Sequence, residues 1–136
     1  MMLDDVATYV AANSTAHTVG VNLTKGFMPE NPGTVTTLFE TGGFYPLHYF
    51  STGSQTRGYE RPGLMVHSRS TDYQTARTAI DAVFTLLDGI TDTGLPTSTG
   101  THYVAIDATQ SPFEIGRDRN DRFLLGVNFN VTKTTG

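Results

Sequence analysis

The stretch between Pro62 and Ile90 constrains the fold most, because it joins an alternating segment to an amphipathic one. Residues 64–69 alternate, with Leu64 and Val66 on one side, and this pattern predicts a strand. The apolar residues that follow recur at helical spacing and would form one stripe: Tyr73, Ala76, Ile80, Val83, Phe84 and Leu87. Gly89 provides the left-handed residue that often ends a helix. We therefore expect a strand and then a long amphipathic helix against which the sheet packs.

The two ends of the helical segments have sequence signals of their own. Thr71 and Gln74 have the spacing of a capping box, in which each side chain binds the other residue's backbone N–H. The long helix is therefore expected to begin at Thr71. A short first helix is also expected over residues 3–12, with an apolar face formed by Leu3, Val6, Ala7 and Val10.

Five strands are expected in all, at residues 18–23, 34–40, 64–69, 101–107 and 122–133. The last is the longest, and it carries five apolar residues at strict period two: Phe123, Leu125, Val127, Phe129 and Val131. The segments between them are expected to be irregular: an aromatic-rich loop from Phe44 to Pro62, a turn segment at 91–100 and a charged loop at 108–121.

These elements predict a single α+β domain over residues 1–136, in the order α-β-β-β-α-β-β. One mixed or antiparallel sheet of four to five strands would pack against the long amphipathic helix. We expect the last two strands to pair antiparallel. If the third and fourth strands lie side by side, the helix between them makes a right-handed crossover and the sheet is mixed.

The charge and the cysteine content exclude some classes of function. The formal net charge is −4, which argues against a nucleic-acid-binding domain, since such domains carry a basic patch. A protein that DNA passes without being gripped remains compatible with this charge. There is no cysteine, so disulfides and thiolate metal sites are excluded. No apolar run approaches the length of a membrane span.

No catalytic or metal-binding constellation is recognisable. Asp118, Asn120 and Asp121 begin like a calcium loop, but the required Gly and distal Glu are missing, so we expect a turn stabilised by Asp and Asn side chains. The histidines lack ligand spacing and are expected to be isolated, on loops or solvent-facing strand positions: His17, His48, His67 and His102. We therefore expect a protein that is not an enzyme and has no metal or cofactor.

Two segments are candidates for contacts with other proteins. The aromatic-rich loop would either cover its own domain as a lid or present residue types that are enriched at interfaces: Phe44, Tyr45, Tyr49, Phe50, Arg57 and Tyr59. The charged run from 117 to 122 would ordinarily be a solvated loop. In a ring of identical subunits its alternating signs would allow complementary contacts between neighbours, through Arg117, Asp118, Arg119, Asp121 and Arg122.

Several short motifs follow one another between residues 3 and 133: Phe27-Met28-Pro29-Glu30-Asn31-Pro32, Glu40-Thr41-Gly42-Gly43, Tyr59-Glu60-Arg61-Pro62, Val66-His67-Ser68-Arg69, Leu86-Leu87-Asp88-Gly89, Ser111-Pro112-Phe113-Glu114-Ile115-Gly116-Arg117-Asp118, and Asn120-Asp121-Arg122 leading into Val127-Asn128-Phe129. In this order they resemble the tail terminator (minor capsid, tail-completion) proteins of long-tailed bacteriophages. One departure is at Asn120-Asp121-Arg122, where similar sequences often carry Gly before the Arg.

The resemblance implies a non-enzymatic virion protein of the tail or neck, made in the host cytoplasm. Its relatives assemble a ring, usually of six subunits, on the head-proximal end of the tail tube. The implied partners are further copies of the chain, the tail tube protein and the head connector or stopper protein. The ring would end tube polymerisation and join the tail to the connector, while genome DNA passes through its lumen without specific binding.

Two alternatives stay open. A head-completion or stopper protein of the neck would share the ring symmetry and belong to the same particle. A small monomeric α+β ligand-binding or enzyme domain would instead show one deep apolar pocket with convergent polar groups and would stay monomeric at every concentration.

Overall fold

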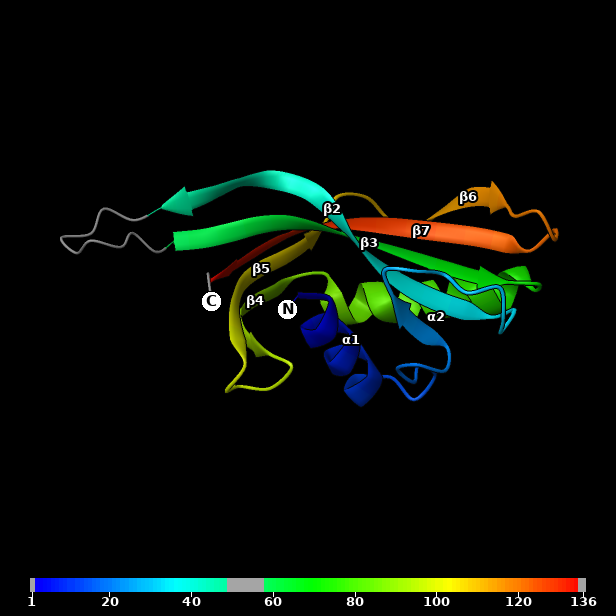
Figure 1. Cartoon of the computed structure of the whole chain (residues 1–136), viewed down its shortest axis with the longest axis horizontal. Helices are drawn as coiled ribbons and strands as arrows, with labels where there is room; N and C mark the ends of the chain where they lie inside the picture. Colours follow the sequence, from blue (N-terminus) through cyan, green and yellow to red (C-terminus); the bar gives the residue numbers. More distant parts are fainter. Residues whose placement is uncertain (1, 49–57, 135–136) are drawn as a thin grey trace.

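The computed structural model describes residues 2–48 and 58–134 (Figure 1). Two helices and seven strands follow one another in the order α1 (Met2–Asn13), β1 (Leu23–Lys25), β2 (Val35–His48), β3 (Gly58–Ser70), α2 (Tyr73–Leu87), β4 (Ile90–Leu95), β5 (Thr101–Ala108), β6 (Phe113–Arg117) and β7 (Phe123–Thr134). The α+β class is confirmed. The expected sheet of four to five strands is wrong, because the described residues form seven strands in one sheet.

The sheet has the order β1-β2-β3-β7-β5-β4, and β6 pairs with the part of β7 that β5 leaves free. All described pairs are antiparallel except β1 with β2, so the sheet is mixed. The expected antiparallel pairing of the last two long strands, β5 and β7, is confirmed. The third and fourth expected strands, β3 and β5, are not neighbours, because β7 lies between them. The parallel pair therefore comes from β1 and β2 and not from a crossover through α2.

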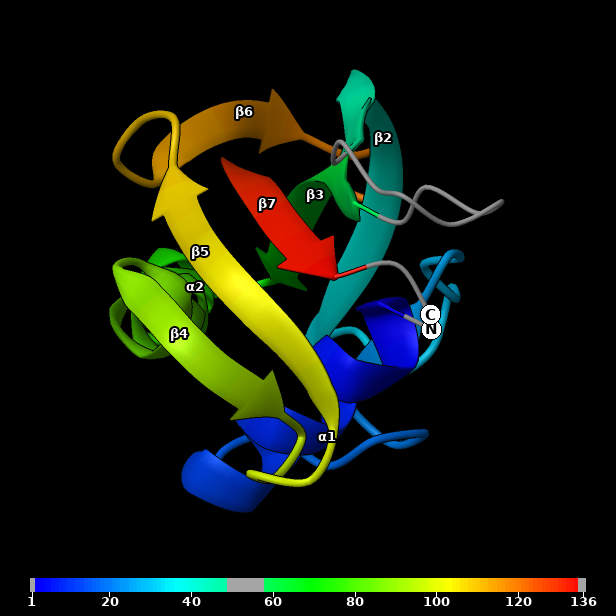
Figure 2. The same ribbon diagram turned by 90° about the vertical axis from the view of Figure 1, so that its left-hand side faces the viewer.

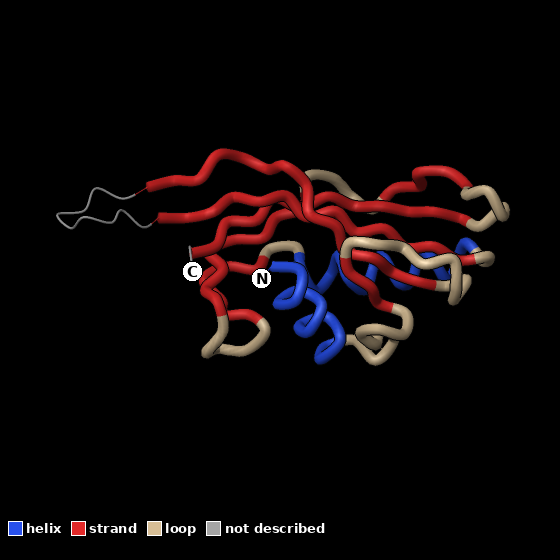
Figure 3. Tube along the Cα trace, in the orientation of Figure 1, coloured by secondary structure: helices blue, strands red, loops and turns tan. Residues whose placement is uncertain are grey.

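Both helices lie on the same side of the curled sheet, and among the described residues no helix covers the other side (Figures 1 and 3). We call this second side the outer face. Figure 2 shows the curl of the sheet, with β6 and β2 bordering the strands β3 and β7. The side chains that face the helices form the core, and its largest fully buried members are Tyr103, Phe129, Leu23, Leu38, Leu64, Ile80, Leu87, Leu95, Ile106 and Leu125.

The long helix has the predicted apolar stripe. Ala76, Ile80, Val83 and Leu87 are buried, whereas Tyr73 is 39% exposed and packs edge-on against the ring of Phe123. The predicted capping box is wrong in position. Asp72 is the N-cap, and its Oδ2 accepts the Thr75 backbone N–H at 3.2 Å, because an Asp one residue later provides the stronger acceptor. Gly89 follows the helix with φ at +86°, as predicted.

The first helix also follows its prediction, with Leu3, Val6, Ala7 and Val10 buried. A polar contact fixes α1 on the sheet, since the Tyr103 hydroxyl donates to Asp5 Oδ2 at 2.9 Å. Burial, together with this carboxylate, raises the pKa of Tyr103 well above its usual value, so the phenol stays protonated as the donor.

The irregular segments of the sequence contain strand. Residues 44–48 extend β2 and residues 58–62 extend β3, and the two strands project together beyond the rest of the sheet (Figure 1). We call residues 41–48 and 58–63 the β2–β3 arm. Strand β4 lies in the expected turn segment and β6 in the expected charged loop, whereas the expected strand at 18–23 is reduced to Leu23–Lys25. Each of these extended segments is stabilised by pairing with the neighbouring strand of a hairpin, β2 with β3, β4 with β5 and β6 with β7, and their own side chains show no apolar alternation that would predict this pairing.

Candidate interaction surface

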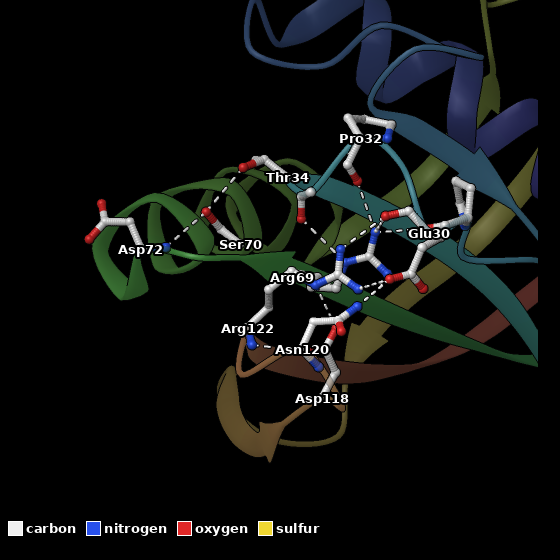
Figure 4. Close-up of polar contacts among 11 residues, drawn as sticks. Glu30, Pro32, Thr34, Arg69, Ser70, Asp72, Asp118, Asn120 and Arg122 are labelled. Atoms are coloured by element: carbon white, nitrogen blue, oxygen red, sulfur yellow. Dashed lines mark hydrogen bonds and ion pairs between the residues drawn. The ribbon is translucent and has the colours of Figure 1, made fainter.

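Two buried arginines hold the loop between β1 and β2 against the end of the sheet (Figure 4). Arg69 is 4% exposed and donates to the backbone carbonyls of Pro29 at 2.5 Å, Pro32 at 2.8 Å and Gly33 at 3.2 Å. Arg122 is 7% exposed. A loop with two prolines has few backbone donors of its own, and here the carbonyl groups of the loop are satisfied by side chains instead.

Arg122 joins this loop to the turn between β6 and β7. Its Nη1 donates to the Glu30 carbonyl and its Nη2 to Glu30 Oε1, both at 2.9 Å, while its Nε donates to Asp118 Oδ2 at 2.8 Å. Burial and the nearby Arg122 charge lower the pKa of Arg69, and the Asp118 and Glu30 carboxylates oppose this effect. The two like charges are therefore held together by the two carboxylates that face them. We call Glu30, Arg69, Asp118 and Arg122 the arginine node.

The β6–β7 turn is the Asp- and Asn-stabilised turn that the sequence predicts. Asp118 Oδ1 accepts the backbone N–H groups of Asn120 at 3.0 Å and Arg122 at 2.9 Å. Partial burial raises the pKa of Asp118, but hydrogen bonds from Arg122 and Asn120 outweigh this effect and hold the pKa below its usual value. Asp121 takes a φ of +62°, the backbone conformation that a Gly would otherwise provide before Arg122. The departure from the Gly of similar sequences therefore leaves the turn intact.

The node unites three motifs that are far apart in the sequence: Pro29 to Pro32, Val66 to Arg69, and Asp118 to Arg122. Glu30 and Arg69 are not among the site residues that the sequence predicts. The available signal was weak: a charged residue between two prolines, and an arginine in an alternating strand.

The predicted contact residues of the charged run divide into two groups. Asp118 and Arg122 are bound to each other within the chain, and Arg122 is buried. Arg117 is exposed, lies 4.3 Å from the centroid of the Phe123 ring and pairs with Asp121 at 2.9 Å. Arg119 is exposed, and within residues 2–48 and 58–134 it has no hydrogen bond or ion pair. No comparison or contact tests the role of these residues between subunits, which stays a prediction.

Three of the predicted contact residues of the aromatic segment, Phe44, Tyr45 and Tyr59, belong to the β2–β3 arm. Phe44 is 56% exposed, and the Arg61 guanidinium lies 5.3 Å from its ring centroid. Tyr59 is half-buried on β3 and pairs with Thr134. The side chain of Tyr45 and the whole of Tyr49, Phe50 and Arg57 lie outside the described residues. The arm and the charged run are at opposite ends of the sheet, so the structure does not bring the two predicted groups together (Figure 1).

A cavity of about 390 Å³ lies between the loop after α1 and the first turns of α2. Its lining carries no formal charge if His17 is neutral. His17 lies on a loop, as predicted, although its side chain is only 4% exposed. Its Nδ1 lies 2.8 Å from Ser14 Oγ and its Nε2 lies 3.3 Å from Thr36 Oγ1. Burial lowers the pKa of His17, which favours the neutral ring.

In the part of the chain that the structure describes, no group of three or more His, Asp or Glu residues is placed to hold a metal ion. None of the described helices is both long and apolar enough to cross a membrane. The described surface also carries large apolar side chains that are exposed: Val19, Val21, Phe27, Phe44, Tyr73, Phe113 and Ile115.

Comparison with known proteins agrees with the motifs. The family model for the bacteriophage tail terminator protein matches residues 9–135. A chain of the structure described as the virion of a native gene transfer agent (GTA) particle superposes with a TM-score of 0.60 at 16% identity, covering 97% of this chain and 96% of that chain. At this identity the likeness shows the fold alone. A search of curated protein sequences finds no significant match. Because the family model spans nearly the whole chain, this protein belongs to the bacteriophage tail terminator family.

Proposed function

We propose that the chain forms a ring, of six copies, that caps the head-proximal end of a phage tail tube. The ring ends tube polymerisation and presents the surface that joins the tail to the head connector. The observation that carries this proposal is the family match over residues 9–135, which makes the chain a structural component of a virion tail. The ring, its six-fold count and its partners go beyond that match.

The charges of the described surface support passage of DNA through such a ring. Lys25 pairs with Asp4, Arg77 with Asp81 and Lys133 with Glu60, and Arg122 pairs with both Glu30 and Asp118. Arg117 pairs with Asp121. A lumen lined with free cations would gain counterion-release affinity for DNA and retain it. A subunit of net charge −4, with most of its described cations paired, avoids retaining the DNA in this way.

The test is reconstitution with the purified chain. Particles made without the chain should contain tails of abnormal length that do not join heads, and added chain should bind these tails at their head-proximal end. Cryo-electron microscopy of the repaired particles should show a closed ring of this chain at that joint. Binding to DNA-filled heads instead of tails would favour the head-completion alternative, and absence from purified virions would refute both.

A further inference from the structure

Besides the outer edges of the terminal strands β1 and β4, two strand edges of the described sheet have no pairing strand. β1 pairs with β2 only as far as Leu38, so the edge of β2 that continues through residues 40–44 pairs with nothing among the described residues. β6 pairs with β7 on one side only. Because the strand order here is β1-β2-β3-β7-β6, these two edges border opposite sides of the same sheet. An edge of this kind is a template for pairing with another chain.

The terminal strand β4 has a protected edge and serves as an internal comparison. Asp92 interrupts it with a φ of +50°, and the Thr93 hydroxyl turns back to the Thr91 carbonyl at 2.7 Å. Close to Gly94 lie the carbonyls of Thr97 and Ser98 from the following turn. A charged residue, an irregular backbone and a covering loop are the usual devices that block edge pairing.

The two open edges also carry exposed apolar side chains on one face. Phe44 is 56% exposed and pairs with Arg61, while Phe113 is 41% exposed and pairs with Gly126, the partner of His67. Arg61 and His67 are six residues apart on β3 and therefore point to the same side. Ile115, 44% exposed, lies over Gly126 on that side too. The outer face thus has an apolar side chain at each open edge.

The strand directions permit pairing between copies. β6 is antiparallel to β7, β7 to β3, and β3 to β2. A copy placed with its β6 beside the β2 edge of another copy, in the same orientation of the sheet, therefore forms an antiparallel pair. This contact uses different surfaces on the two copies, which is the requirement for a ring built head to tail.

The offset along the strand direction between the β2 edge and the β6 edge is compatible with closure of a ring. Within one copy, Phe113 pairs with Gly126, Gly126 with His67 and His67 with Thr37. Phe113 and Thr37 therefore lie at the same height along the strands. Pairing β6 with residues 40–44 shifts the next copy along the strands by about six residues, or roughly 20 Å. Four strands side by side are about 19 Å wide. A closed ring with this offset tilts its strands by about 45° from the ring axis, at the upper end of the range for closed barrels.

We infer that the β6 edge of one copy pairs with the β2 edge of the next at residues 40–44, so that the sheet continues from subunit to subunit and Phe44 meets Phe113 and Ile115 across the joint. This inference rests on the proposed ring. The partner at each edge is a second copy of the chain, because every copy carries both a β2 edge and a β6 edge. The two edges have the strand directions and the offset needed for pairing, and each carries an exposed apolar side chain.

The absence of cysteine makes the test direct, since every thiol is introduced. Gly42→Cys or Glu40→Cys on β2 is combined in one chain with Glu114→Cys or Ile115→Cys on β6, giving four double variants. Gly42 has open space where a Cβ would lie, and Glu40 and Glu114 are exposed. Assembled particles are oxidised and run on a non-reducing gel. At least one double variant should give a ladder from dimer to complete ring, because a disulfide forms only between close Cα atoms.

Two matched controls define the result. Chains with one cysteine each, mixed as β2 and β6 variants, should stop at dimers. Gly42→Cys combined with Thr91→Cys on the protected β4 edge should give no ladder. If cryo-electron microscopy shows the ring in wild-type particles and the thiols react with maleimide, but no β2–β6 pair cross-links, the edge pairing is wrong while the proposed ring stands. If wild-type particles contain no ring of this chain, the proposed function itself fails.

A second pair of variants decides the matter if the cysteine variants do not assemble. Phe44→Glu and Phe113→Lys replace exposed side chains, and each alone should lower incorporation into particles by about tenfold, whereas together they should restore it. Unchanged incorporation of the single variants, or failure of the double variant to recover while its isolated chain unfolds normally, would overturn the inference.

Discussion

Arg122 binds Asp118 twice, through its backbone N–H to Oδ1 at 2.9 Å and through its guanidinium Nε to Oδ2 at 2.8 Å. The same guanidinium reaches Glu30 on the β1–β2 loop. One side chain therefore fixes the shape of its own turn and the position of a distant loop.

Replacing Arg122 should destabilise the chain, because the substitution removes the charged partner of both the Asp118 and the Glu30 carboxylates. We expect Arg122→Met to lower the free energy of unfolding by about 2–4 kcal/mol. The measurement is urea denaturation of the isolated chain. Arg119→Met, which removes an exposed arginine from the same turn, should change stability by no more than about 0.5 kcal/mol. Equal losses in the two variants would contradict a role of the node in stability.

Two adjacent glycines on the arm should respond very differently to alanine. At Gly43 the φ is +62°, and a Cβ would lie 2.3 Å from the Arg61 carbonyl oxygen and 2.6 Å from the Gly63 backbone nitrogen. Gly42 has no atom within 4 Å of that position. Gly43→Ala should therefore cost about 2 kcal/mol or more, whereas Gly42→Ala should be near neutral. Urea denaturation compares the two variants, and indistinguishable midpoints would show that the backbone at Gly43 tolerates a side chain.

Stability should fall as the pH drops below about 6.5, the ordinary histidine value. Burial lowers the pKa of both His17 and His67 in the folded chain, so the unfolded chain binds more protons over this interval. The contribution of the two neutral histidines to stability is thus fully present above their pKa in the unfolded chain. It is lost as the pH falls toward their lower pKa in the folded chain. His17→Gln and His67→Gln should each flatten the slope of unfolding free energy against pH between about 7 and 5. A slope unchanged in the double variant would refute this assignment.

The lumen of the proposed ring should carry few or no unpaired Lys or Arg side chains. Most described cations are already paired within the chain, and fixed positive charge would hold the passing DNA. A cryo-electron microscopy map of the virion tests this by showing which side chains line the channel. A channel lined with unpaired arginines would contradict it.

The arm should be needed for assembly more than for folding. Deleting residues 45–59 is expected to abolish tail assembly while leaving thermal unfolding of the isolated chain intact, since the core lies between the sheet and the two helices. Scanning calorimetry and electron microscopy of tails measure the two properties. Normal tails without the segment would show that it has no partner. A large drop in melting temperature would show that the arm supports its own domain.

The sequence by itself determined the parts of the fold whose signals are local and repeated. The stripe from Ala76 to Leu87, the alternation of β7 and the glycine stop at Gly89 are each visible within a few turns of chain, because burial of one face imposes a period on the residues. The ordered motifs also determined the family, since a family signature is a property of sequence.

The tertiary structure alone decided which strands pair and which charges meet. Strands β4 and β6 are short and are held by pairing with β5 and β7 and not by an apolar alternation of their own, and Arg69, Arg122 and Glu30 approach one another across 39 to 92 residues of sequence. A hydrogen bond to a carbonyl or an ion pair between residues so far apart produces no periodic pattern in the sequence. The open edges of β2 and β6 exist for the same reason, because an edge is defined by the strand that is missing beside it.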